Sequence, residues 1–90
     1  MRFALICRDR PGALPVRVAN RSAHLAHIEI TGVVDMAGPF LDAADQMCGS
    51  LIILEVADLQ AAKAWAAADP YALAGLFESV SIQAWKKVIG

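Results

Sequence analysis

The stretch SLIILEV, residues 50–56, is a nearly continuous apolar run that begins directly after a glycine. Such a run predicts a strand in the middle of a sheet, where both faces are covered. Three more segments predict strands: residues 2–7, ended by the breaker DRPG; residues 33–38, ended by a bend at Gly38-Pro39 before a polar tip at 42–49; and residues 77–89, where apolar and polar side chains alternate.

Helical spacing predicts a long helix from about Leu14 to Ile30. A second helix is expected over residues 59–68, with Asp58 as its N-cap. The Asp69-Pro70 pair should end this helix and start a short third one, because proline disfavours helical geometry in the residue before it and fits the first helical position. The resulting βαββαβ order predicts an α+β, ferredoxin-like fold, with a four-stranded antiparallel sheet and its helices on one face.

Ninety residues are enough for one domain, and 58% of them are hydrophobic. A domain of this size hides only about 60% of the surface that its unfolded chain exposes. One copy therefore cannot bury the apolar surface of so many hydrophobic residues. We therefore expect a homodimer or a larger assembly, in which a second copy covers the sheet face that the helices leave open.

Charge and cysteine content exclude several classes of function. Eight basic and nine acidic side chains are scattered along the chain, and the single basic doublet Lys86-Lys87 does not make a nucleic-acid surface. No stretch predicts a membrane span or a signal peptide, which favours a cytoplasmic protein. Cys7 and Cys48 lack metal-site or redox spacing, and with no third or fourth ligand in sight neither a metal nor another cofactor is expected.

Two histidines three residues apart, His24 and His27, lie in the long helix. A helical wheel predicts that an arc from Leu14 through Val18, Arg21 and Leu25 to Ile28 faces the sheet, and it puts His24 at the margin of this arc. His27 points away from the arc, toward solvent or another subunit. The wheel thus prefers His24 as the residue of a cleft wall.

Local patterns leave a structural alternative open for every candidate. A lone histidine on a helix shoulder is often only a hydrogen-bonded structural residue, and Asp69 is explained by its capping position. The remaining candidates for contact with a small-molecule ligand are Arg17, Arg21, Ser50 and Tyr71. The two arginines could instead be solvated, the serine ordinary sheet surface and the tyrosine part of the core.

Short motifs along almost the whole chain, in the same order and spacing, resemble the YCII-related (YciI-like) family. They are RSAHLA (21–26), AGP (37–39), GS (49–50), WAAADPY (65–71), AGLFESV (74–80) and WKKV (85–88). The resemblance implies a dimeric α+β barrel with a His-Asp pair in a cleft, which by position would be His24 and Asp69. It also implies a fold like that of muconolactone isomerase, and dehydrochlorination of a chlorinated hydroxyquinol is an activity assigned within the family.

Two functions from different classes follow. In the first, His24 is a general base oriented by Asp69, and a small lyase, isomerase or dehydrochlorinase moves a proton on a small organic, aromatic or phenolic substrate. Arg21 or Arg17 would then hold the anion that develops. In the second, the same cleft only binds a small molecule, or the domain is an accessory to another enzyme.

Overall fold

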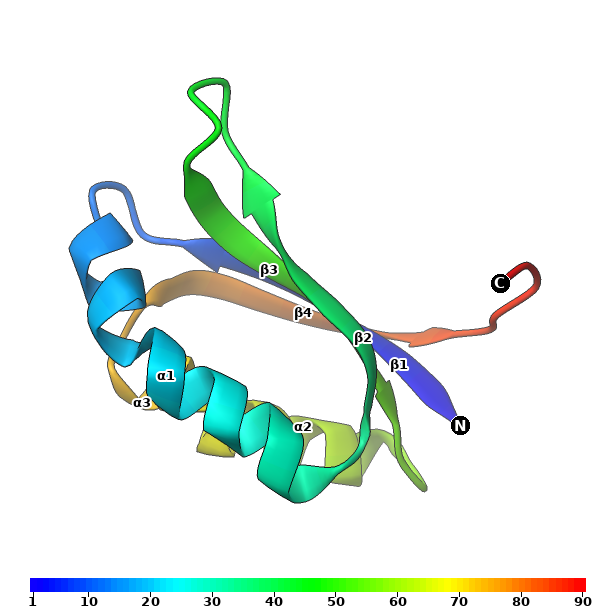
Figure 1. Cartoon of the computed structure of the whole chain (residues 1–90). Coiled ribbons are helices and arrows are strands. Elements are labelled where there is room, and N and C mark those ends of the chain that lie inside the picture. The colour runs from blue at the N-terminus through cyan, green and yellow to red at the C-terminus, as the bar shows by residue number, and fades with distance from the viewer.

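The computed structural model describes all 90 residues, and its elements follow the expected order. They are β1 (Arg2–Asp9), α1 (Leu14–Thr31), β2 (Val34–Leu41), β3 (Met47–Glu55), α2 (Leu59–Ala68), α3 (Pro70–Leu73) and β4 (Phe77–Trp85). The strands form one antiparallel sheet in the order β2-β3-β1-β4, and the helices lie together on one side of it (Figure 1). This is the ferredoxin-like α+β fold that the sequence predicts.

The core lies between the sheet and the helices. Alternate residues of β1 and β3 point toward α2, so Phe3 and Leu5 pack with Ile52 and Leu54 against Trp65. The central position of β3 agrees with its apolar sequence, since both of its neighbours in the sheet are strands. No helix combines the length and the apolar character that a bilayer crossing requires.

Side-chain and glycine caps set the helix boundaries as the sequence predicts. Asp58 accepts a hydrogen bond from the backbone N–H of Ala61 at 2.9 Å and begins α2. Asp69 has extended backbone geometry, ends α2 and accepts from the backbone N–H of Tyr71 at 2.9 Å, which begins α3. At the far end of α1, Gly32 has the left-handed geometry (φ 64°) that favours glycine.

Boundaries of all four strands differ from the prediction, and β1 runs to Asp9, two residues beyond the expected end at Cys7. β2 does not bend at Gly38-Pro39 but continues to Leu41, because it is an edge strand and a proline there interrupts no central hydrogen-bond ladder. β3 begins at Met47, three residues before the expected start, so the hairpin tip is shorter than predicted. β4 ends at Trp85, whereas the alternation suggested a strand up to Ile89.

The face of α1 that packs inward was predicted only in part, since Ile28 at the end of the predicted arc does pack against the core. Val18 and Leu25, placed on the buried arc by the wheel, are 59% and 46% exposed, while Arg17 and His24 are buried. Arg21, expected near the centre of that arc, is exposed. The inward stripe can include these polar residues because each has a partner on another element, and hydrophobic periodicity alone does not identify them.

Candidate active site

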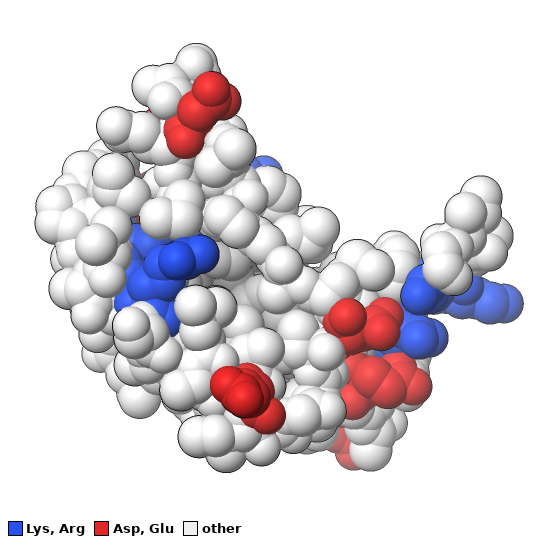
Figure 2. Space-filling view, in the orientation of Figure 1, with Lys and Arg blue, Asp and Glu red and all other residues white.

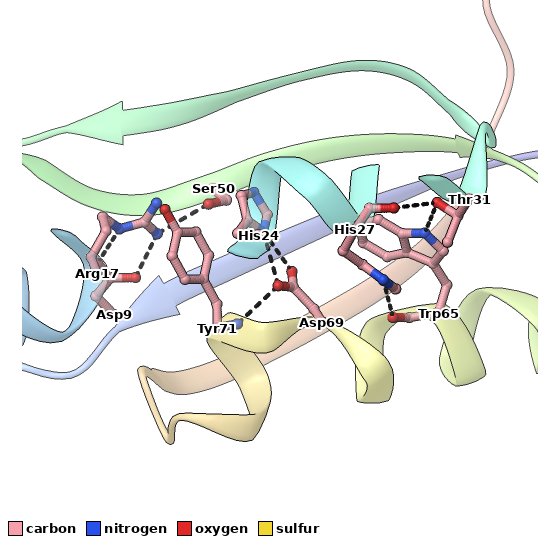
Figure 3. A network of polar contacts seen from close by, with 9 residues as sticks. All are labelled: Asp9, Arg17, His24, His27, Thr31, Ser50, Trp65, Asp69 and Tyr71. Atoms are coloured by element: carbon pink, nitrogen blue, oxygen red, sulfur yellow. Dashed lines mark hydrogen bonds and ion pairs between the residues drawn. The ribbon is translucent and has the colours of Figure 1, made fainter. Parts of the chain in front are cut away.

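His24 and Asp69 meet between α1 and the junction of α2 and α3 (Figure 3). His24 Nδ1 lies 2.8 Å from Asp69 Oδ1 and 3.0 Å from Oδ2, and the two side chains are only 7% and 2% exposed. An ionised carboxylate can only accept hydrogen bonds, so in a neutral ring it favours the proton on Nδ1, which leaves the other ring nitrogen, Nε2, as an acceptor.

Nε2 of His24 is the free end of this pair. It has no hydrogen-bond partner within the chain, yet no side-chain nitrogen or oxygen in the molecule is both fully buried and unpartnered. Nε2 is therefore reached by solvent, and His24 lines a cavity of about 120 Å³ between α1 and strands β2 and β3. A neutral imidazole whose accepting nitrogen faces a cavity has the geometry of a general base.

Tyr71 holds the His24 ring flat. The two rings stack with centroids 4.0 Å apart and an angle of 14° between their planes. Tyr71 is itself buried, and the edge of Phe77 packs against it. Burial raises the pKa of the Tyr71 phenol, although the nearby charges of Arg17 and Arg21 act to lower it.

The buried side chain of Arg17 is bonded to other residues of the protein. Its guanidinium donates to both oxygens of Asp9, at 2.7 and 2.8 Å, and to Ser50 Oγ at 3.0 Å, and it lies 4.6 Å from the centre of the Tyr71 ring. Burial alone would lower the pKa of Arg17, but the hydrogen bonds and charge of Asp9 outweigh it and raise that pKa further. Ser50 is thus not ordinary sheet surface, because it is buried and accepts from Arg17, while its own O–H donates to no residue of the chain.

Arg21 differs from Arg17 in having no partner. It lines the same cavity, is exposed, and makes no hydrogen bond or ion pair with any residue. The predicted site residues therefore lie around one cavity: His24, Arg17, Arg21, Ser50 and Tyr71 line it, and Asp69 lies behind His24.

His27 is the residue that sequence reasoning misplaced. It is half-buried rather than turned to solvent: Nε2 lies 3.2 Å from the backbone oxygen of Trp65, and the ring packs on the indole. The Trp65 indole donates to Thr31 Oγ1, which donates to the backbone oxygen of His27 (Figure 3). The Asp69-Pro70 pair was the sequence signal for this contact. Pro70 cannot donate a backbone N–H and α2 ends just before it, so backbone carbonyls in the last turn of α2 need other hydrogen-bond donors.

Cys7 lies on the helix-facing side of β1, near the charged side chains of Asp69, Arg17 and Asp9. Burial raises its pKa to about 12, and the negative charge of Asp69 acts in the same direction. It is therefore a protonated, unreactive thiol at neutral pH. No group of three or more histidine, cysteine, aspartate or glutamate side chains is arranged to hold a metal ion.

A model of the YCII-related domain matches residues 1–86. The chain belongs to the YCII-related family. It is 38% identical to Protein YciI of Escherichia coli over 98% of this chain and 99% of that protein. An uncharacterized protein of Haemophilus influenzae is 35% identical over the same shares of the two chains.

Two solved structures are similar to this chain over nearly its whole length. The chain is similar to 5-chloro-2-hydroxyhydroquinone dehydrochlorinase (TftG) from Burkholderia phenoliruptrix, solved in complex with 2,5-dihydroxybenzoquinone, with a TM-score of 0.89 and 35% identity over 96% of this chain and 94% of that one. An antibiotic biosynthesis monooxygenase shares the fold alone, with a TM-score of 0.61 at 12% identity over 98% of each chain.

Proposed function

We propose that this protein is a small proton-transfer enzyme of the lyase, isomerase or dehydrochlorinase kind. The observation that carries the proposal is the buried His24–Asp69 pair, which leaves Nε2 of the imidazole open to a cavity. The likeness to a dehydrochlorinase with a bound quinone supports a small aromatic or phenolic substrate.

The chemistry follows from the roles of the two ring nitrogens. Nε2 accepts a proton from an acidic C–H or O–H of the substrate, and the carboxylate of Asp69 stabilises the imidazolium that forms. In an elimination, a leaving group such as chloride then departs with its bonding electrons. In an isomerisation, the same imidazolium returns the proton to another carbon. No cofactor takes part in either step.

The surrounding residues prepare the base rather than react. Tyr71 stacks on the ring of His24, so little rearrangement is needed when the proton arrives. Arg17 and Ser50 form a hydrogen-bonded wall behind the tyrosine, and Arg21 is left to meet the negative charge that develops on the substrate.

Chloride release from 5-chloro-2-hydroxyhydroquinone, measured without oxygen, tests the proposal. His24→Gln should lower the rate by about 10²–10⁴-fold, the usual contribution of a general base. His27→Gln is the matched control, since a glutamine amide can still donate to the Trp65 carbonyl and the residue lies outside the cavity. Equal rates for His24→Gln and wild type would refute the role of His24. Saturable binding of this compound with neither chloride release nor deuterium uptake from solvent would favour a binding module.

Assembly as an isologous homodimer is part of the proposal. The sheet face opposite the helices carries Leu51, Met36 and Trp85, which are 37%, 48% and 38% exposed. A second copy laid on this face would cover them and complete a dimeric α+β barrel with two equivalent cavities. Sizing at micromolar concentration should give the mass of a dimer, and a stable monomer would contradict it.

The proposed location is the cytoplasm. Cys7 and Cys48 are both free thiols, which fits a compartment that keeps cysteines reduced.

A further inference from the structure

We infer that the ligand of this cavity is a small organic monoanion whose charged group is bound by Arg21. The inference rests on the proposed function for the position of the reacting atom, at His24, but the anion site stands on separate observations. These are the distribution of charge around the cavity, its size, and the spacing of the two residues along α1.

The cavity is lined by positive charge and by no negative charge. Of its twelve lining residues, two are arginines and none is an aspartate or glutamate. The two carboxylates nearby are turned away from the cavity, because Asp9 is held by Arg17 and Asp69 by His24. In the space-filling view, Lys and Arg atoms gather in a hollow beside α1 with no Asp or Glu atoms next to them (Figure 2).

Only one of the two arginines can bind an external anion. The guanidinium of Arg17 already donates three hydrogen bonds, two of them to a carboxylate that neutralises its charge. Arg21 has all of its donors free, and its charge is felt inside the site, since it acts on the pKa of Tyr71. A planar guanidinium with free donors suits a carboxylate or a delocalised oxyanion, which it can bind through two parallel hydrogen bonds.

The helix places the side chain that carries this charge next to the base. Arg21 and His24 are three residues apart on α1, so their side chains are neighbours on one face, with Cβ atoms roughly 5–6 Å apart. A ligand whose anionic group meets Arg21 therefore carries its acidic hydrogen only a few bonds away from that group.

The cavity also limits the size of the ligand. Its volume of about 120 Å³ is close to the roughly 150 Å³ of an apolar cavity that binds benzene. Its remaining walls include the aliphatic side chains of Leu25, Ile28, Ile52 and Pro39. The volume of the cavity, its aliphatic walls and the charge of Arg21 together fit a compound with one ring or a short carbon chain and a single negative group.

Benzoate and benzamide are matched probes for this inference, because they have nearly the same shape and only benzoate is charged. Binding is followed by NMR titration of the isotope-labelled protein. We expect benzoate to shift the signals of His24 and Tyr71, and benzamide to bind at least about tenfold more weakly. Added salt should weaken benzoate alone.

Variants of Arg21 locate the charge. Arg21→Gln should weaken benzoate about tenfold or more, and Arg21→Lys should recover part of the loss, because lysine keeps the charge without the planar fork. Arg10→Gln is the matched control, since Arg10 is also an exposed arginine and does not line this cavity. Equal binding of both probes, unchanged binding by Arg21→Gln, or no benzoate binding to the wild type would overturn the inference.

These outcomes separate the inference from the proposed function. Arg21-dependent benzoate binding without turnover of any substrate would leave the anion site in place and remove the catalytic proposal. Turnover that depends on His24 but keeps the same kcat and KM in Arg21→Gln would support the catalytic proposal and remove the anion site.

Discussion

An Asp69→Asn substitution should move the proton of the neutral His24 ring from Nδ1 to Nε2. In the native protein, Asp69 Oδ1 accepts from the Tyr71 N–H at 2.9 Å, and both carboxylate oxygens face His24 Nδ1. An asparagine keeps one oxygen for the Tyr71 N–H, so its NH₂ takes the place of Oδ2, 3.0 Å from the ring nitrogen. The retained oxygen also lies 2.8 Å from Nδ1, but a neutral amide oxygen that already accepts from the Tyr71 N–H is a weaker acceptor than the carboxylate. A proton on Nδ1 would also face the amide N–H, so we expect Nδ1 to become the acceptor.

The size of this effect follows from the hydrogen bond that is lost. A hydrogen bond to a charged group contributes about 1.5–3 kcal/mol, which biases the native ring toward the Nδ1–H form about 10- to 150-fold. In the variant, Nε2 carries the proton into the cavity and cannot act as a base. The same tautomer exchange lowers kcat about 10⁴-fold in a Ser-His-Asp protease, and we expect a loss on that order for turnover here. Benzoate binding should change little, because Arg21 is untouched.

Long-range ¹⁵N–¹H correlation spectra at alkaline pH read the tautomer of each histidine directly. His27 serves as an internal control, because its Nε2–H donates to the Trp65 carbonyl and should stay on Nε2 in both proteins. His24 should change from Nδ1–H to Nε2–H on substitution. The reasoning is refuted if the wild-type His24 already carries its proton on Nε2, or if the variant keeps it on Nδ1 while the rest of the spectrum shows a native fold.

Three further predictions concern stability, measured by urea unfolding. The raised pKa of Cys7 means that the folded state holds a proton that the unfolded chain loses, so the stability is intact below pH 9.0 and is lost as pH rises toward 12. Wild type should therefore lose up to about 1.4 kcal/mol more per pH unit than Cys7→Ala across this window, and parallel losses would contradict the assignment. Gly49→Ala should lose about 1–3 kcal/mol because its new Cβ would overlap the Cys7 carbonyl oxygen, whereas Gly38→Ala meets open space and should be near neutral. Arg17→Met should lose about 3–5 kcal/mol by leaving Asp9 buried without its partner, and adding Asp9→Leu should restore most of the loss. Equal stability of the single and double variants would show that the ion pair is not the cause.

How much of the molecule can be predicted from sequence differs between backbone and side chains. β3 and the two aspartate caps, Asp58 and Asp69, were predictable because each follows from a few adjacent residues. The course of β2 was not, because a Gly38-Pro39 pair indicates a bend unless the strand is known to lie at the sheet edge. Edge position is a property of the whole sheet.

The site shows the same division. The family motifs point to His24 and Asp69, and the structure puts these two side chains in contact. The helical wheel assumes that apolar residues turn inward, and it failed on Arg17 because its partner, Asp9, lies on another element. Which polar residues a helix buries depends on partners that periodicity along one segment does not describe.

The buried pair of Arg17 and Asp9 is better explained by what it holds than by stability. Replacing such a pair with well-packed apolar residues is often neutral or stabilising, so a core seldom needs one. Here the guanidinium lies 4.6 Å from the centre of the Tyr71 ring, and Figure 3 shows that ring between Arg17 and His24. The arginine thus supports the tyrosine that supports the histidine, while Asp9 cancels its charge. Because that charge is cancelled at Arg17 and left free at Arg21, the positive charge available to a ligand lies on an exposed side chain of the cavity, three residues along α1 from the imidazole that must accept a proton.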